Sequence, residues 1–238
     1  MASANRFRDL REHVLDANRA IVDAGLVVLT FGNASGADRS AGVMAIKPSG
    51  ISYDELGPES IVIVDLEDGV VVEGAHRPSS DTPTHLVLYQ AFDGIGGVVH
   101  THAPFATAWA QAQREIPCLG TTHADHFRGP VPVTRPLSPE EIGGDYERCT
   151  GEVIAETFER LGLDAVETPA ALVASHGPFA WGADVAEAVE NAVALEAVAA
   201  SAFRTELLRP GVEPVPDELL LRHFLRKRGP GAYYGQPT

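Results

Sequence analysis

The chain has 238 residues, of which 45% are hydrophobic and 21% charged, proportions that are ordinary for a globular protein with its own core. Its net charge of −15 and the lack of a basic run argue against nucleic acid as a partner. No apolar stretch approaches the ~18 residues of a membrane span, and the charged N-terminal segment does not resemble a secretory signal. We therefore expect a cytoplasmic protein that binds neither membranes nor nucleic acid.

Helical and strand patterns alternate in the first half of the chain. Apolar residues at helical spacing from Phe7 to Ile21 predict a helix that Gly25 stops. A loop is expected at "GNAS", and the helix over 80–89 is expected to be capped by Ser80 or Asp81. Short strands are predicted at 26–31, 43–47, 61–66 and 70–73.

The second half shows the same alternation. "SPEE" and "DVAE" have the form of capping boxes, and they predict helices that run to Leu161 and to about Leu208. Strands are predicted at 96–102, 171–177 and 178–182, and further helices at 104–112 and 216–227. This mixture predicts one α/β domain over residues 1–238, with a central sheet covered by helices.

Two histidines, His100 and His102, end the apolar run "GGVVHTH". Alternate residues of a strand share a face and lie ~6.6 Å apart, so both imidazoles can reach one ion. The alternative is one core and one surface histidine. Asp81 at a helix start and His176 at a strand end favour the metal, because three histidines and a carboxylate suit zinc or manganese. His85 is a rival ligand, four residues after Asp81.

Three short segments, "GNAS", "KPSG" and "RPSSDTP", carry small residues, free N–H groups and hydroxyls. Each alone is an ordinary turn, but together they predict an anion cradle for a phosphate group. Lys47 lies in the second segment and is suited to bind an anion. In the tail, Tyr233 and Tyr234 are either proton carriers or an aromatic plug on the surface.

Seven segments follow one another along the chain: "TFGNAS", "IKPSG", "PSSDTPTH", "GGVVHTH", "GTTHAD", "SHGPFAWG" and "LRKRGPGAYYGQ". In this order they resemble the class II aldolase/epimerase family, and within it the pentulose-phosphate 4-epimerases. The resemblance covers nearly the whole chain. It implies a central, mostly antiparallel sheet layered with helices, and a homotetramer with active sites between subunits. It also implies a divalent metal ion, usually zinc, with manganese as an alternative.

The resemblance also implies roles for individual positions. The implied metal ligands are Asp81, His100, His102 and His176. Implied substrate and phosphate contacts are Gly32, Asn33, Ser49, Gly50, Ser79 and Ser80. To these we add Lys47, which lies in the same "KPSG" segment as Ser49. Asp125 and Tyr234 match the acid/base pair, and the supporting positions are Thr121, Glu147 and His223.

The implied reaction interconverts L-ribulose 5-phosphate and D-xylulose 5-phosphate, in arabinose catabolism or another pentose pathway. The C4 proton is not acidic, so we expect C3–C4 to break and re-form in a retro-aldol and aldol sequence, with a proton carrier on each face of the aldehyde. The aspartate at position 81, where related aldolases carry a glutamate, favours the epimerase. The alternatives are a class II sugar-phosphate aldolase of the fuculose-phosphate type and a metal-binding domain without turnover.

Overall fold

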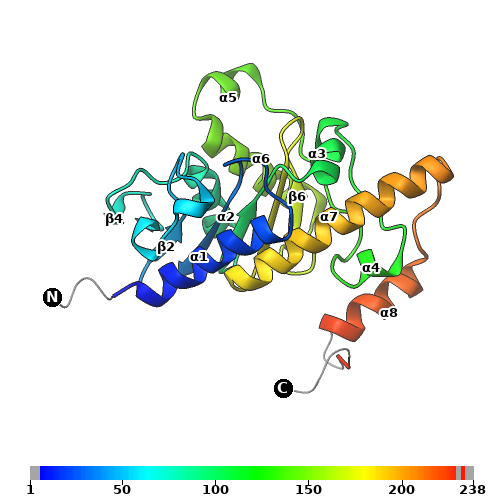
Figure 1. The fold of residues 1–238 in the computed structure, drawn as a ribbon. Coiled ribbons are helices and arrows are strands. Elements are labelled where there is room, and N and C mark those ends of the chain that lie inside the picture. The colour runs from blue at the N-terminus through cyan, green and yellow to red at the C-terminus, as the bar shows by residue number, and fades with distance from the viewer. Residues whose placement is uncertain (1–5, 229–231, 234–238) are drawn as a thin grey trace.

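Across the residues that the computed structural model describes, 6–228 with 232 and 233, seven strands form one sheet in the order β4-β3-β2-β1-β5-β7-β6 (Figure 1). Every pair of neighbouring strands is antiparallel. The predicted mostly antiparallel α/β architecture is thereby confirmed. The strands are β1 (Asn33–Asp38), β2 (Val43–Ile46), β3 (Val62–Asp65), β4 (Val71–Glu73), β5 (Gly97–His100), β6 (Ala170–Leu172) and β7 (Pro178–Gly182).

Helices cover both faces of this sheet. Two long helices, α1 (Arg8–Asp23) and α7 (Val185–Leu208), lie on one face with α3 (Pro104–Gln111). The opposite face is covered by α2 (Thr82–Ala91) and α6 (Tyr146–Leu161). The remaining helices are α4 (Thr121–Ala124), α5 (Pro139–Gly143), α8 (Asp217–Arg228) and the 3-10 turns Tyr53–Glu55 and Pro58–Ser60. None of the described helices is both long and apolar enough to span a bilayer.

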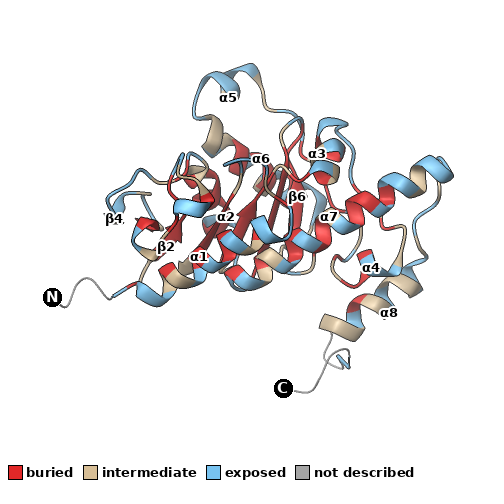
Figure 2. Cartoon of the chain, in the orientation of Figure 1, coloured by how far each residue is buried: buried red, intermediate tan, exposed pale blue. Residues whose placement is uncertain are grey.

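The sheet separates two apolar cores. Successive side chains of a strand point to opposite faces, so one strand contributes residues to both cores. In β2, Val43 and Ala45 point to the α1/α7 side, while Met44 and Ile46 point to the α2/α6 side. The strands are buried except for β4 at one edge and the last residues of β1 and β3, and α5 and much of α8 remain exposed (Figure 2). The core therefore needs neither a metal ion nor a disulfide to hold the sheet together.

The predicted first strand at 26–31 is wrong, because the first strand begins at Asn33, where a loop was expected. The apolar side chains of Val28 and Phe31 are half exposed, so the run leaves the core after its buried first residue, Leu26. Small residues form the strand instead, because α1 crosses it closely: a Cβ on Gly36 would lie 3.0 Å from Val14. The Asn18 amide on α1 also exchanges two hydrogen bonds with the backbone of Ala34.

The other predicted elements are present, but several boundaries differ. The strands predicted at 96–102 and 171–177 end at His100 and Leu172, so they contain neither His102 nor His176. The helix predicted to run from "SPEE" to Leu161 is divided, because α5 ends at Gly143 and a non-helical Gly144 follows. The caps predicted from "SPEE" and "DVAE" are confirmed: Ser138 accepts from the N–H of Glu141, and Asp184 from that of Glu187.

Close packing of α7 against β5 fixes the strand that leads to His100. A Cβ on Gly97 would lie 2.4 Å from both the Asp184 carbonyl oxygen and Val185 Cα. Glu196, farther along α7, accepts hydrogen bonds from the N–H groups of Phe105 and Ala106 at the start of α3. The chain on both sides of the histidine pair is therefore held by one helix.

We predict that Gly97→Ala destabilises the protein by about 3 kcal/mol, the upper end of the range for an overpacked core, because the clashing atoms are backbone. Gly143→Ala is the matched control, since nothing lies within 4 Å of its Cβ. Denaturant unfolding of both variants measures the difference. Equal stability of the two variants would show that α7 and β5 can separate at little cost.

Candidate metal centre and anion cradle

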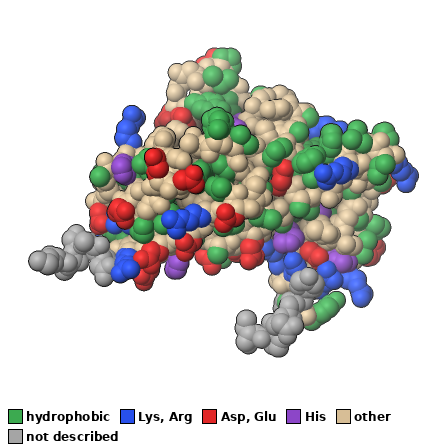
Figure 3. Space-filling view, in the orientation of Figure 1, with side chains coloured by type: hydrophobic (Ala, Val, Ile, Leu, Met, Phe, Trp, Pro, Cys, Tyr) green, Lys and Arg blue, Asp and Glu red, His purple; other side chains and the backbone are tan. Residues whose placement is uncertain are grey.

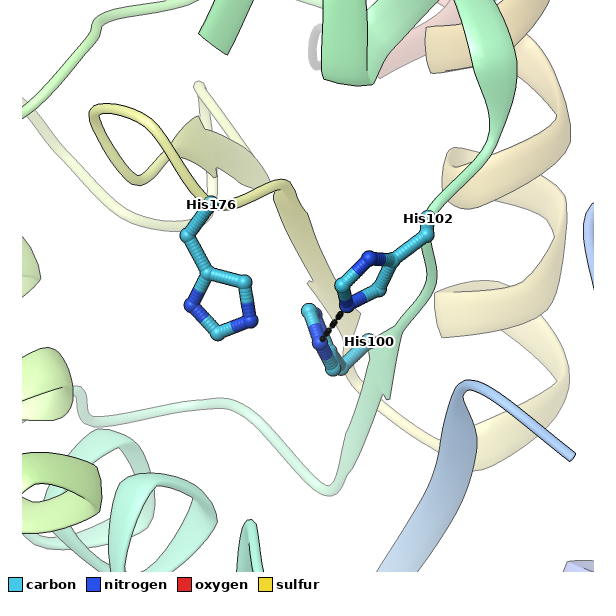
Figure 4. Close-up of side chains that lie close together, drawn as sticks. All are labelled: His100, His102 and His176. Atoms are coloured by element: carbon cyan, nitrogen blue, oxygen red, sulfur yellow. Dashed lines mark hydrogen bonds between the residues drawn. The ribbon is translucent and has the colours of Figure 1, made fainter. Parts of the chain in front are cut away.

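Within the described part of the chain, three imidazoles converge beyond the ends of β5 and β7 (Figure 4). His100 is the last residue of β5, His102 follows it, and His176 lies in the turn between β6 and β7. Their ligand atoms all lie within 4.8 Å of one another, and the Nε2 atoms of His100 and His102 are 3.2 Å apart. A tetrahedral ion with metal–nitrogen bonds of ~2.0–2.1 Å would separate two ligand nitrogens by roughly 3.3 Å. The pair therefore fits one metal ion.

The backbone fixes which nitrogen of His100 faces the centre. Its Nδ1 donates to the Pro178 carbonyl oxygen at 2.9 Å, which leaves the lone pair of Nε2 free for a metal. Its ring stacks on Phe179 with the centroids 4.2 Å apart. The neighbouring turn is equally constrained, because a Cβ on Gly177 would lie 3.0 Å from the Thr101 carbonyl oxygen.

The three histidines are neutral at physiological pH. Burial lowers the pKa of His100 and of His102, and the Asp81 carboxylate only partly opposes this. Burial, together with the two neighbouring imidazoles, lowers the pKa of His176 to about 4. A neutral imidazole is the form that binds a metal, so the triad is ready for an ion without losing protons.

Asp81 lies beside this triad. It occupies the N-cap position of α2, but its side chain caps nothing, contrary to the sequence prediction. Its Oδ2 accepts a hydrogen bond of 2.6 Å from Asn33 Nδ2. Burial opposes the charge of Asp81, yet His100 and the bond from Asn33 hold its pKa below the ordinary value. Among the described residues the tight group of ligand atoms contains the histidines alone. Asp81 therefore stays a proposed fourth ligand.

His85, the rival ligand, belongs to the core. It is fully buried, its Nδ1 bonds Ser35 Oγ at 2.7 Å, and burial lowers its pKa to about 3. Its ring lies edge-on to Phe179. It is outside the triad in the described structure, so it does not compete for the ion.

The three segments predicted to form an anion cradle do meet. The N–H of Ser49 donates to the Arg77 carbonyl oxygen and that of Ser79 to the Lys47 carbonyl oxygen, both at 3.0 Å. Asn33 Nδ2 donates to Ser79 Oγ at 3.0 Å and thereby ties the first segment to the third. Because the same amide bonds Asp81, both of its N–H groups are used, and Asn33 links the cradle to the metal centre.

Two glycines of the cradle have backbone conformations that favour glycine. Gly32 has φ +100°, and a Cβ there would lie 2.9 Å from the His100 carbonyl oxygen. Gly50 has φ +70° in open space. Ser80 is exposed beside the buried Ser79. The turn at Gly32 thus brings the start of the cradle against the end of β5, at His100.

Lys47 is a buried cation in this cradle, with 2% of its surface exposed. Its Nζ lies 4.8 Å from the centre of the Tyr53 ring and donates to the Pro48 carbonyl oxygen at 3.3 Å. No carboxylate within salt-bridge distance is recorded for it in the described part of the chain. Burial lowers its pKa. A buried ammonium without a counter-charge is costly, so this arrangement favours an anionic ligand.

The predicted acid/base residue Asp125 lies in a separate group of side chains. It follows α4, and both of its oxygens accept bonds from α8, where His223 Nδ1 donates at 3.0 Å and Arg226 donates twice. No contact between this group and the histidine triad is recorded among the described residues. Tyr234, the other predicted acid/base residue, lies outside the described residues.

The remaining predicted positions are divided between these two places. Thr121 begins α4 and lines a cavity of about 280 Å³ between α4 and α7. Glu147 lies in the first turn of α6, where its carbonyl oxygen accepts a bond from Thr84 on α2. Tyr146, which the sequence analysis missed, places its hydroxyl 3.4 Å from His176 Nδ1. No local pattern marks this tyrosine, because only the packing of α6 on α2 brings it there.

We predict that His100→Asn loses most of its bound metal while the fold persists, because the apolar cores do not depend on the triad. Metal content after dialysis and circular dichroism measure the two effects. His13→Asn, at an exposed position outside the triad, is the control and should retain its metal. A full metal complement in His100→Asn would contradict the assignment of the triad.

Residues 12–203 match the family model described as class II aldolase and adducin N-terminal domain. L-ribulose-5-phosphate 4-epimerase UlaF proteins from Salmonella paratyphi A (strain ATCC 9150 / SARB42) and Salmonella typhi are each 52% identical over 95% of this chain and 98% of their own length. Among solved structures, an L-fuculose 1-phosphate aldolase has a TM-score of 0.75 and 26% identity, covering 90% of this chain and 94% of its own. The chain therefore belongs to the class II aldolase family.

Proposed function

We propose that this protein is a metal-dependent 4-epimerase that interconverts L-ribulose 5-phosphate and D-xylulose 5-phosphate. The observation that carries the proposal is the link through Asn33, which joins an anion cradle to a site for a divalent metal. A sugar phosphate has the two chemical ends that such a joined site requires. The relatives at 52% identity carry this activity in their names, which supports the same assignment for this chain.

The cradle holds the phosphate end of the substrate. Lys47 supplies the charge, and the hydroxyl groups of Ser49, Ser79 and Ser80 supply hydrogen-bond donors. A fixed phosphate keeps the two-carbon fragment in place after C3–C4 cleavage, so that it can rotate and react again without escaping. Retention of both fragments is what distinguishes an epimerase from an aldolase.

The triad and Asp81 hold the metal, which we propose to be zinc, with manganese as an alternative. When bound, the ion supplies Lewis-acid stabilisation of the negative charge that develops on the substrate during C3–C4 cleavage. His100 is oriented for this by Pro178, and Asp81 by Asn33. Tyr146, at the start of α6, places its hydroxyl beside His176, and Glu147 follows it in the chain.

Asp125 and Tyr234 serve as the proton carriers for the two faces of the aldehyde. Because Asp125, His223 and Thr121 lie apart from the triad, we propose that they act at the metal centre of a neighbouring subunit in a homotetramer. The half-exposed apolar side chains of Phe31 beside His102, and of Leu225 on α8, are suited to burial between copies. We place the enzyme in the cytoplasm.

A class II sugar-phosphate aldolase is the second candidate, favoured by the likeness to the L-fuculose 1-phosphate aldolase structure. Incubation of the metal-loaded enzyme with L-ribulose 5-phosphate separates the two. An epimerase produces D-xylulose 5-phosphate, and this conversion stops after treatment with a chelator. Accumulation of free glycolaldehyde phosphate without the second pentulose phosphate would favour the aldolase.

Lys47→Met should raise KM for L-ribulose 5-phosphate about 10- to 100-fold, which corresponds to the loss of a charge-assisted contact of ~1.5–3 kcal/mol. The metal content should not change, because Lys47 is not a ligand. Steady-state kinetics with phosphorylated and unphosphorylated L-ribulose provide the comparison, and only the phosphorylated sugar should bind more weakly. An equal loss for both sugars would place the phosphate elsewhere.

Tyr234→Phe keeps the ring but removes the proton, so we predict a loss in kcat of ~10²–10⁴ with metal and oligomer intact. Tyr233→Phe is the matched control and should have little effect, since the Tyr233 side chain is 69% exposed. Measuring kcat for both variants in parallel shows which tyrosine transfers the proton. If Tyr233→Phe is the impaired variant, the assignment is off by one residue, and if neither is impaired, the tail does not transfer protons.

A further inference from the structure

One arginine on α8 contacts both Asp125 and Tyr233. Arg226 Nε donates to Asp125 Oδ1 at 2.9 Å, and its Nη2 donates to Oδ2 at 2.6 Å. Its backbone carbonyl oxygen accepts a hydrogen bond of 2.9 Å from the N–H of Tyr233, the residue before Tyr234. The guanidinium therefore holds the carboxylate, while the main chain of the same residue holds the start of the tail.

We propose that Arg226 is a positioning residue for proton transfer, which fixes Asp125 through its guanidinium and holds the backbone of Tyr233 through its carbonyl oxygen. The inference rests on the proposed epimerase function. A bidentate arginine fixes both the plane and the direction of a carboxylate, which a single point charge does not. Asp125 is 9% exposed, so few other groups compete for its oxygens.

The surroundings keep Asp125 in the acceptor form. Burial opposes its charge, but the bonds from Arg226 and His223 hold its pKa below the ordinary value. The other charged and titratable groups nearby are His126, whose pKa burial lowers, and Lys227, which contacts His126. An ionised aspartate takes up a proton and cannot donate one, so Asp125 begins the turnover as the base on its side of the aldehyde.

A purely structural explanation exists, because Arg226, Lys227 and Arg228 form a basic last turn that complements the dipole of α8. Figure 3 shows basic and histidine side chains gathered over this helix. The dipole responds to any positive charge, however, whereas the two bonds to Asp125 require the planar fork of arginine. Replacement by lysine separates the two explanations.

The experiment compares Arg226→Lys and Arg226→Ala with the control Arg222→Ala, an exposed arginine one turn earlier on the same helix. Each metal-loaded variant is assayed with L-ribulose 5-phosphate for kcat and KM, with its metal content and oligomeric state measured alongside. Arg226→Ala should lose kcat about 10²-fold with KM and metal unchanged, and added guanidinium should restore part of the rate. Arg226→Lys should remain about 10-fold impaired, and Arg222→Ala should match the wild type.

Full kcat in Arg226→Lys would overturn the inference, because charge alone would then suffice. Full kcat in Arg226→Ala would overturn it as well, and in both cases the epimerase assignment would stand. If Arg226→Ala does not fold, the lysine variant still decides the matter. A wild-type enzyme without epimerase activity would overturn the proposed function, and this inference with it.

Discussion

The pair of hydrogen bonds donated by the Asn33 amide is the interaction on which the site depends. One N–H group holds Asp81 and the other holds Ser79, so a single planar group sets the spacing between the metal end and the phosphate end. The amide is 2% exposed, and its Oδ1 has no hydrogen-bond partner among the described residues. A buried polar atom without a partner is costly, so the two donated hydrogen bonds come at the expense of an unpaired Oδ1.

The sheet supports this contact by placing loops at one end of adjacent strands. Asn33 begins β1 directly opposite His100, the last residue of β5, and Phe179 of β7 pairs with His100 on the other side. His102 and His176 lie in the loops that follow, where the backbone can turn their rings toward one point. Rigid strands thus determine the origin of each loop, and the loops supply the chemistry.

Several features of the fold are readable from local patterns. Ser138 and Asp184 cap their helices because a cap depends only on the few residues that follow. The apolar residues of segment 26–31 match a strand pattern, but this prediction is wrong. The strand is "NASGAD", because the close packing of α1 on it requires small side chains. Contact between distant segments decides that choice, and no local pattern carries it.

The site shows the same division. The spacing of His100 and His102 indicates a metal, but the shared face of a strand does not explain how they meet. His102 lies beyond the strand, and the loop turns its ring toward His100. The converging segments of the cradle could be suggested from composition, but the link through Asn33 could not. Tyr146 and Arg226 were invisible for a similar reason, because α6 on α2 and α8 on α4 bring them to their partners.

If one substrate molecule joins the cradle to the metal, then the binding of zinc and the binding of sugar phosphate must be thermodynamically linked. Zinc affinity is measured with and without saturating L-ribulose 5-phosphate, in the wild type and in Asn33→Ala. We predict that the sugar phosphate tightens zinc binding several-fold in the wild type and that unphosphorylated L-ribulose does so less. In Asn33→Ala the effect of the sugar phosphate on zinc affinity should be smaller. Zinc affinity that is the same with and without the sugar phosphate in the wild type would contradict this linkage.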